Sequence, residues 1–121
     1  MNELTIRDKI KVTDIGQIVL FHAEYYSKKY GWNEDFEAYV AKPLAEFVLR
    51  NDKSEKIWTV EKEGFVKGAI ALTRVTNKVA QLRWFYLVPE LRGQGIGKKL
   101  MEHLVSFAET KKYEEIINKR R

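Results

Sequence analysis

Three glycines at alternate positions form the stretch of this sequence best suited to binding an anion. They lie in the run Arg92-Gly93-Gln94-Gly95-Ile96-Gly97, between an apolar segment that ends at Val88 and an amphipathic segment from Ile96 to Lys111. Glycines leave backbone amides exposed because they carry no Cβ, and a helix that starts there directs free N–H groups and the positive end of its dipole outwards. The pattern therefore predicts an anion site, with phosphate as the first candidate.

The spacing of the glycines excludes two familiar phosphate loops. A P-loop needs Lys followed by Ser or Thr after its last glycine, whereas Gly97 is followed by Lys98 and Lys99. A dinucleotide-binding turn needs two residues between its second and third glycines, and here only Ile96 separates them. A glycine-rich turn that binds no ligand stays open as the alternative.

Composition limits the class of protein. A chain of 121 residues with 45% hydrophobic and 32% charged residues is typical of one soluble globular domain, so we expect a single domain over residues 1–121. The absence of cysteine excludes disulfides, thiol nucleophiles and cysteine-bound metal, and fits a cytoplasmic location. No apolar run approaches a membrane span. The net charge of +5 is spread among acidic residues, which makes nucleic acid an unexpected partner.

The elements that would position the glycines follow from local patterns. We expect a strand over Leu4 to Ile10, and a helix capped by Thr13 or Asp14 that runs to about Tyr30 and is ended by Gly31. A second helix is capped by Asn33, and Pro43 predicts a kink or a break within it. The stripe of apolar residues in the first helix includes His22.

Alternating apolar residues then predict an antiparallel meander. Trp58 and Val60 share a face of its first strand, Glu63-Gly64 forms a turn, and the return strand contains Gly68, which we interpret as merely tolerated rather than as a bulge or a close approach. The third strand, Val79 to Val88, is too apolar for one wet face, so we expect a central strand covered on both sides. After the helix from Ile96 to Lys111, Tyr113 to Ile117 begins another strand.

The glycine run and its surroundings resemble the acetyl-coenzyme A signature of the GNAT superfamily of N-acetyltransferases. That signature has Arg or Gln, two residues, Gly, one residue, then Gly or Ala. The resemblance implies an α/β (α+β) fold with a mixed, largely antiparallel sheet flanked by helices, in the order β-α-α-β-β-β-α and then part of a further strand. A narrower likeness, to acetyltransferase domains fused to MarR-type regulators, rests on residues 22–26, 30–32 and 36–38.

The resemblance also implies the site. Backbone amides of the loop and the Arg92 side chain would hold the pyrophosphate of acetyl-coenzyme A, while Lys98 or Lys99 would reach the ribose phosphate. The end of the preceding strand would pair with the pantetheine arm. The implied cofactor-binding residues are Phe85, Tyr86, Leu87, Arg92, Gly93, Gln94, Gly95, Ile96, Gly97 and Lys98. No metal is expected.

The chain departs from the family in two respects. The strand from Val79 to Val88 contains no Asp or Glu, so Glu24 and His22 of the first helix become the candidates for the general base, although a packed histidine is the commoner case on such a stripe. The strand, helix and further strands that would follow Ile117 are missing. We therefore expect a truncated domain whose exposed sheet edge pairs two copies into a homodimer.

Two functions remain open on the sequence. The first is an N-acetyltransferase that moves an acetyl group from acetyl-coenzyme A to a primary amine of an unknown acceptor. The second is a module that binds coenzyme A with little or no turnover, because the part of the fold that completes the active site is absent.

Overall fold

The computed structural model describes residues 3–118. The chain divides into two compact units, a sheet unit made of Met1–Lys9 and Asp52–Arg121 and a helical unit made of Ile10–Asn51. The sheet unit contains β1 (Leu4–Arg7), β2 (Lys56–Lys62), β3 (Phe65–Arg74), β4 (Val79–Leu87), the 3-10 turn η1 (Pro89–Leu91), α3 (Ile96–Thr110) and β5 (Glu115–Ile117). The helical unit contains α1 (Asp14–Tyr30) and α2 (Glu34–Arg50).

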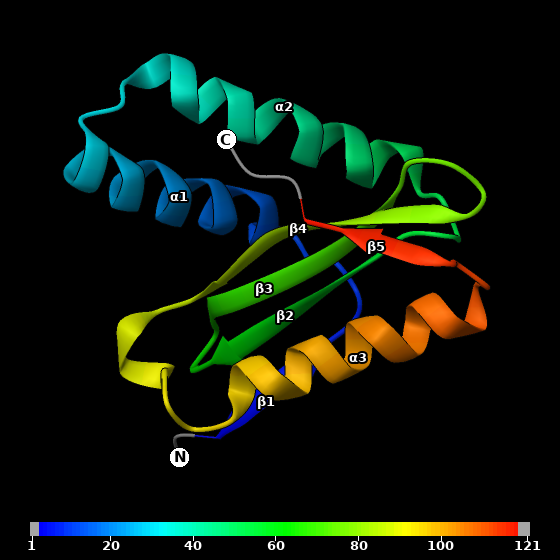
Figure 1. Cartoon of the computed structure of the whole chain (residues 1–121). Coiled ribbons are helices and arrows are strands. Elements are labelled where there is room, and N and C mark those ends of the chain that lie inside the picture. The colour runs from blue at the N-terminus through cyan, green and yellow to red at the C-terminus, as the bar shows by residue number, and fades with distance from the viewer. Residues whose placement is uncertain (1–2, 119–121) are drawn as a thin grey trace. The chain divides into compact units, whose positions relative to one another are not determined.

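The sheet has five strands in the order β1-β2-β3-β4-β5 (Figure 1). The first four are antiparallel to their neighbours, and β5 joins β4 in parallel. A hairpin needs only a short turn, but a parallel pair needs a crossover, which α3 provides. The predicted mixed, largely antiparallel sheet and the order of its elements are confirmed.

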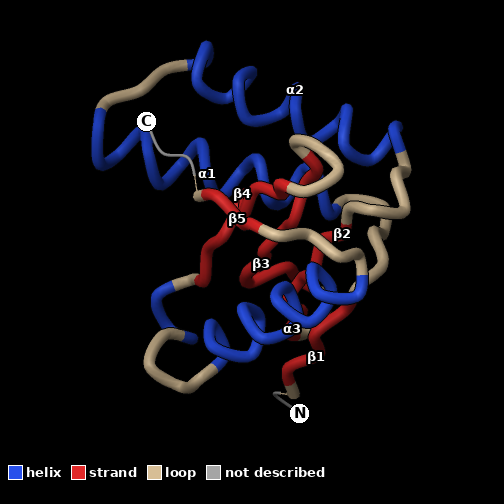
Figure 2. Tube along the Cα trace, turned by 45° about the vertical axis from the view of Figure 1, so that its right-hand side comes forward, coloured by secondary structure: helices blue, strands red, loops and turns tan. Residues whose placement is uncertain are grey.

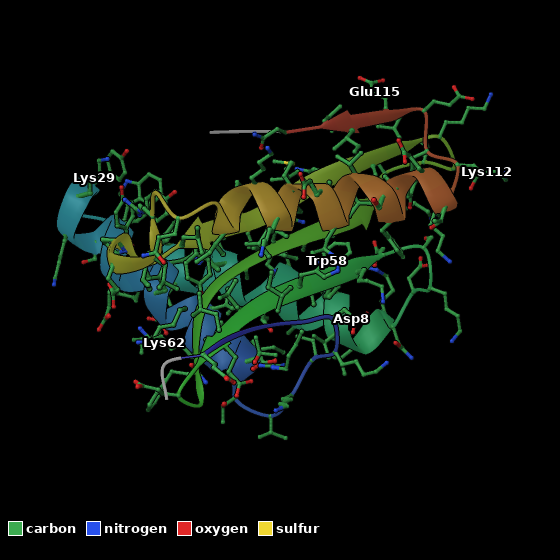
Figure 3. All side chains as sticks on the ribbon, turned by 90° about the horizontal axis from the view of Figure 1, so that it is seen from below. Asp8, Lys29, Trp58, Lys62, Lys112 and Glu115 are labelled. Carbon is green, nitrogen blue, oxygen red and sulfur yellow. The ribbon has the colours of Figure 1, made fainter. Side chains whose placement is uncertain are left out.

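The core of the sheet unit lies between α3 and one face of the sheet. Apolar residues of α3 pack against alternating residues of β2, β3 and β4, and Figure 3 shows Trp58 of β2 beneath the helix. The spacing of the helical residues, three or four apart, puts them on one stripe. The buried cluster comprises Trp58, Val60, Ile70, Leu72, Ala80, Leu82, Leu91, Ile96, Leu100, Leu104 and Ala108.

Gly68 is a position of close approach, so our interpretation of it as merely tolerated is wrong. A Cβ built on it would lie 2.6 Å from Leu87 Cδ2 and 2.8 Å from the backbone oxygen of Tyr86. The register of β2 against β3 also shifts there, from Val60 opposite Gly68 to Glu61 opposite Val66. The alternation of residues along one strand carries no information about how near a neighbouring strand comes.

β4 is irregular near its end. Its register against β3 passes from Arg83 opposite Ala71 to Tyr86 opposite Ala69, so β4 contributes one residue more than β3 over this stretch, which defines a bulge. Trp84, within the bulge, has φ 50°. β4 does lie between two strands, but Phe85 is 42% exposed, so the expectation of a strand covered on both sides throughout is wrong.

The ends of the sheet differ from the sequence prediction. β1 ends at Arg7, whose guanidinium bonds the carboxylate of Glu61 and the carbonyl of Lys9 and so bends the chain earlier than expected. β5 begins at Glu115, because Tyr113 is tied by its N–H to the carbonyl of Ala108 and by its hydroxyl to that of Ser54. Figure 2 shows β5 alongside the first half of β4.

The helical unit is a pair of helices joined at Gly31 (Figure 1). Gly31 has φ 70° and donates its N–H to the carbonyl of Ser27, and the side chain of Asn33 accepts from the N–H of Asp35, as predicted. Thr13 is the N-cap of α1 without a side-chain cap bond. α2 continues through Pro43, which excludes the break but not the kink of the prediction that Pro43 causes one or the other. Its buried stripe extends on both sides of the proline.

Candidate cofactor-binding site

The glycine run forms the corner between β4 and α3. Pro89 ends β4 and opens η1, whose Leu91 is buried in the core of the sheet unit. The N–H of Arg92 then bonds the carbonyl of Pro89, and the chain turns through the glycines into α3. Because Leu91 and Ile96 are both buried in that core, the loop between them is anchored at each end.

Two of the glycines have a backbone that side chains rarely adopt. Gly93 has φ 79° and Gly95 has φ 82°. Gly95 is also the N-cap of α3. A Cβ on either would meet nothing within 4 Å. Glycine is therefore favoured at both positions by the positive φ of the backbone and not by a lack of space. The loop presents its backbone to open space, as a ligand approaching it requires.

Two side chains of the loop donate hydrogen bonds to backbone carbonyls that precede the loop. Arg92 Nε donates to the carbonyl of Leu87 at 3.1 Å, and Gln94 Nε2 donates to the carbonyl of Glu90 at 3.0 Å. The Arg92 bond ties the end of β4 to the corner, so this side chain positions the loop as well as adding a positive charge to it.

The N-terminus of α3 is positively charged. No side chain caps it and its first turn holds no acidic residue, whereas Lys98 and Lys99 lie there, both exposed. Cations near a helix N-terminus oppose the helix dipole, typically at about 0.3–1 kcal/mol each. A polyanion bound by the free N–H groups would reverse this cost, so the charge pattern suits a phosphate ligand.

The two edges of β4 are paired to different extents. Among residues 3–118, β5 pairs with β4 from Val79 to Gln81, whereas β3 pairs with β4 as far as Leu87. The side chains of Phe85 and Leu87 both reach the start of α3, each 3.7 Å from a Cβ built on Gly97. The predicted residues from Phe85 to Lys98 therefore lie together, on β4, the loop and the first turn of α3. Tyr86 is buried on β4.

The two candidates for the general base lie on α1, in the helical unit. His22 is buried, its Nδ1 lies 2.8 Å from the carbonyl oxygen of Ile18, and it stacks on Tyr26. Burial lowers the pKa of His22, partly opposed by the bond to Ile18. Glu24 is exposed, and two residues along a helix turn it about 200° away, so the two candidates do not share a face.

Aromatic residues form one cluster in the helical unit. Tyr26 is its centre, with ring centroids 5.5 Å from Tyr30, 5.4 Å from Trp32 and 5.2 Å from Phe36. Tyr30 and Trp32 are 53% and 40% exposed. The outer rings of the cluster are therefore in contact with solvent.

Arg83 and Trp84 are not among the residues predicted from the sequence. The guanidinium carbon of Arg83 lies 4.5 Å from the centroid of the Trp84 ring, at the bulge of β4. No local pattern marks a bulge in a strand without glycine, so the only available signal was a basic residue in an otherwise uncharged strand.

A model of the acetyltransferase (GNAT) family matches residues 18–120. The chain belongs to the acetyltransferase (GNAT) family. No curated protein matches it. Acetyl-coenzyme A, which this family uses, carries a pyrophosphate and an extended amide arm. The pyrophosphate suits the glycine corner, and the amide arm suits the adjoining edge of β4.

Solved structures share the fold of this GNAT chain. An acetyltransferase from Streptococcus agalactiae is 23% identical with a TM-score of 0.75, covering 95% of this chain and 71% of its own. A predicted acetyltransferase from Clostridium acetobutylicum, solved with acetyl-CoA, is 18% identical with a TM-score of 0.76, covering 98% of this chain and 81% of its own. An acetyltransferase from Trypanosoma brucei is 16% identical, with a TM-score of 0.66, and covers 98% of this chain and 84% of its own.

These matches leave two narrower expectations without support. None of them favours the domains fused to MarR-type regulators over other GNAT members. The homodimer across the sheet edge stays a prediction. Within residues 3–118, no helix is long and apolar enough to cross a membrane.

Proposed function

We propose that this chain is an N-acetyltransferase that moves an acetyl group from acetyl-coenzyme A to a primary amine. The observation that carries the proposal is the corner itself, where two glycines with positive φ, a helix N-terminus without a side-chain cap and two lysines meet the end of β4. Membership of the GNAT family and the acetyl-CoA in the Clostridium structure support it.

In this proposal the corner holds the pyrophosphate. The backbone N–H groups between Gly93 and Gly97 would donate to phosphate oxygens, and Lys98 would add a charge-assisted contact. Phe85 and Leu87 would present backbone groups at the edge of β4 to the amides of the pantetheine arm, as in the addition of a strand to a sheet. When bound, the cofactor supplies the acetyl group as a thioester, which a neutral amine accepts.

The acceptor amine must lose a proton, because a free alkyl ammonium has a pKa of about 10. His22 and Glu24 are the proposed proton acceptors. The lowered pKa of His22 keeps the imidazole neutral near pH 7, which is the form that accepts a proton. With Nδ1 held by the carbonyl of Ile18, Nε2 is the nitrogen that would act. Loss of kcat in His22→Gln with unchanged coenzyme A affinity would support this role, and Glu24→Gln is the matched test for the second candidate.

The second candidate function is a module that binds coenzyme A without turnover. It is favoured by the absence of Asp and Glu from β4. The edge of β4 at Phe85 and Leu87, which we call the proposed cofactor edge, therefore has no carboxylate of its own to act as an acid or a base.

Two measurements separate these functions. Calorimetry should show binding of coenzyme A and much weaker binding of pantetheine, which lacks the pyrophosphate and so cannot use the corner. Thiol release from acetyl-coenzyme A is then followed over a panel of primary amines. Amine-dependent release supports the transferase, binding without release supports the module, and no binding of coenzyme A contradicts both.

A further inference from the structure

The short turn between β4 and the glycine corner is closed by hydrogen bonds to consecutive backbone carbonyls. The carbonyls that accept these bonds are those of Leu87, Val88, Pro89 and Glu90. The donors for the middle two are backbone N–H groups, of Leu91 at 3.0 Å and of Arg92 at 3.1 Å. The donors for the outer two are side chains, Arg92 Nε and Gln94 Nε2. A side-chain donor therefore closes the turn at each of its ends.

The bond from Arg92 reaches a backbone group of the proposed cofactor edge. The N–H of Val88 donates to the carbonyl of Lys67 on β3 at 2.9 Å. The carbonyl of Leu87 belongs to the same peptide unit, which is trans, so this carbonyl points away from β3. There Arg92 Nε donates to it at 3.1 Å. The side chain of Arg92 therefore joins the backbone of the proposed cofactor edge to the start of the glycine corner.

The hydrogen bond and the charge of Arg92 are separate contributions. The side chain is exposed, so solvent and salt screen its positive charge. The bond to Leu87 uses an N–H group at a fixed place and needs no charge. Coenzyme A would span both ends of this turn, with its pantetheine arm on one side and its pyrophosphate on the other. Such a ligand binds best when the separation of the two ends is set in advance, because its apparent affinity is reduced by the fraction of molecules that lack the right arrangement.

From these observations we infer that Arg92 is a positioning residue, whose Nε–H bond to the carbonyl of Leu87 holds the proposed cofactor edge and the glycine corner in the arrangement that coenzyme A requires. The inference rests on the proposed function, because both ends of the turn are assigned there to coenzyme A. It goes beyond the contact with the pyrophosphate that the family resemblance implies for Arg92. In it the contribution of Arg92 to binding comes mainly from the N–H donor at Nε and not from the positive charge.

Three substitutions of Arg92 separate the donor from the charge. Arg92→Gln removes the charge but keeps an N–H donor the same number of bonds from Cα as Nε. Arg92→Lys keeps the charge and places a methylene at that position, and Arg92→Met keeps neither the charge nor the donor. Calorimetry with coenzyme A should show that Arg92→Gln binds about 3- to 10-fold more tightly than Arg92→Met, the range expected for one hydrogen bond. It should also bind more tightly than Arg92→Lys. An affinity of Arg92→Lys equal to or above that of Arg92→Gln would overturn the inference.

Pantetheine, which carries no phosphate, gives a second readout. NMR titration with pantetheine should place Arg92→Gln above Arg92→Met again, because Leu87 belongs to the proposed cofactor edge. A difference between these variants that appears with coenzyme A and not with pantetheine would mean that residue 92 acts on the phosphates, and would overturn the inference while leaving the proposed function intact. All affinities are compared at a temperature at which circular dichroism shows each variant to be folded. No binding of coenzyme A by the native protein would overturn the proposed function and the inference together.

Discussion

Substitution of Gly68 by alanine gives the sharpest test of how the cofactor edge is built. The added methyl would lie 2.6 Å from Leu87 Cδ2 and 2.8 Å from the backbone oxygen of Tyr86. The Leu87 side chain can rotate away, but the Tyr86 oxygen belongs to β4, so the strand itself has to shift. Overpacking of this kind costs about 1–3 kcal/mol, and the loss of glycine freedom in the unfolded chain returns about 0.4–1 kcal/mol.

The net expectation for Gly68→Ala is a loss of about 1–2 kcal/mol in the free energy of unfolding, or about 4–8 °C in Tm for a chain of this size. Urea unfolding followed by tryptophan fluorescence measures it. The matched control is Gly16→Ala in α1, where a Cβ would meet nothing within 4 Å, and which should gain up to about 1 kcal/mol.

Gly68→Ala should also weaken coenzyme A binding, because the strand that must shift carries Tyr86 and Leu87, which border the proposed cofactor edge. A variant as stable as the native protein, with unchanged coenzyme A affinity, would refute the reasoning from close approach. A destabilised variant with native affinity would refute only the link between the contact and the site.

Three further predictions concern the corner and the helical unit. Gly95→Ala should lose stability and coenzyme A affinity, because alanine at φ 82° is strained by about 1–2 kcal/mol. Gly97→Ala should retain binding, because its Cβ would lie at an ordinary contact distance from its neighbours. Thermal unfolding compares the stabilities of the two variants, and calorimetry compares their affinities for coenzyme A. Replacing Lys98 and Lys99 together by Gln should raise the stability of the unliganded protein, because it removes cations from the N-terminus of α3. The same change should weaken coenzyme A binding and reduce the dependence of that binding on salt. A salt dependence equal to that of the native protein would contradict the proposed contacts. Because the pKa of His22 is lowered in the folded protein, the unfolded chain takes up a proton at His22 below about pH 6.5 more readily than the folded chain does. The free energy of unfolding should therefore fall between pH 7.5 and pH 5.5 more steeply in the native protein than in His22→Gln. The urea midpoint at each pH measures this difference.

Local patterns in the sequence were sufficient to predict most of the elements and the corner. The glycine at the end of α1, the cap of α2 and the turn before β3 depend on neighbouring residues, as does the start of α3 at Ile96. The prediction of an anion site at the corner follows from the same local facts, because three alternating glycines before an amphipathic helix leave amides exposed whatever the rest of the fold. The family resemblance rested on those residues and is confirmed.

Only the tertiary structure revealed the features that depend on a neighbouring strand. The bulge that carries Arg83 and Trp84 exists because β4 has one residue more than β3 across from it, and the close approach at Gly68 depends on where Tyr86 and Leu87 lie. Register is a relation between segments distant in sequence, so the alternation along one strand cannot specify it. The sequence alone therefore located the glycine corner, whereas the fold was needed to reveal the close approach at Gly68 and the bulge of β4.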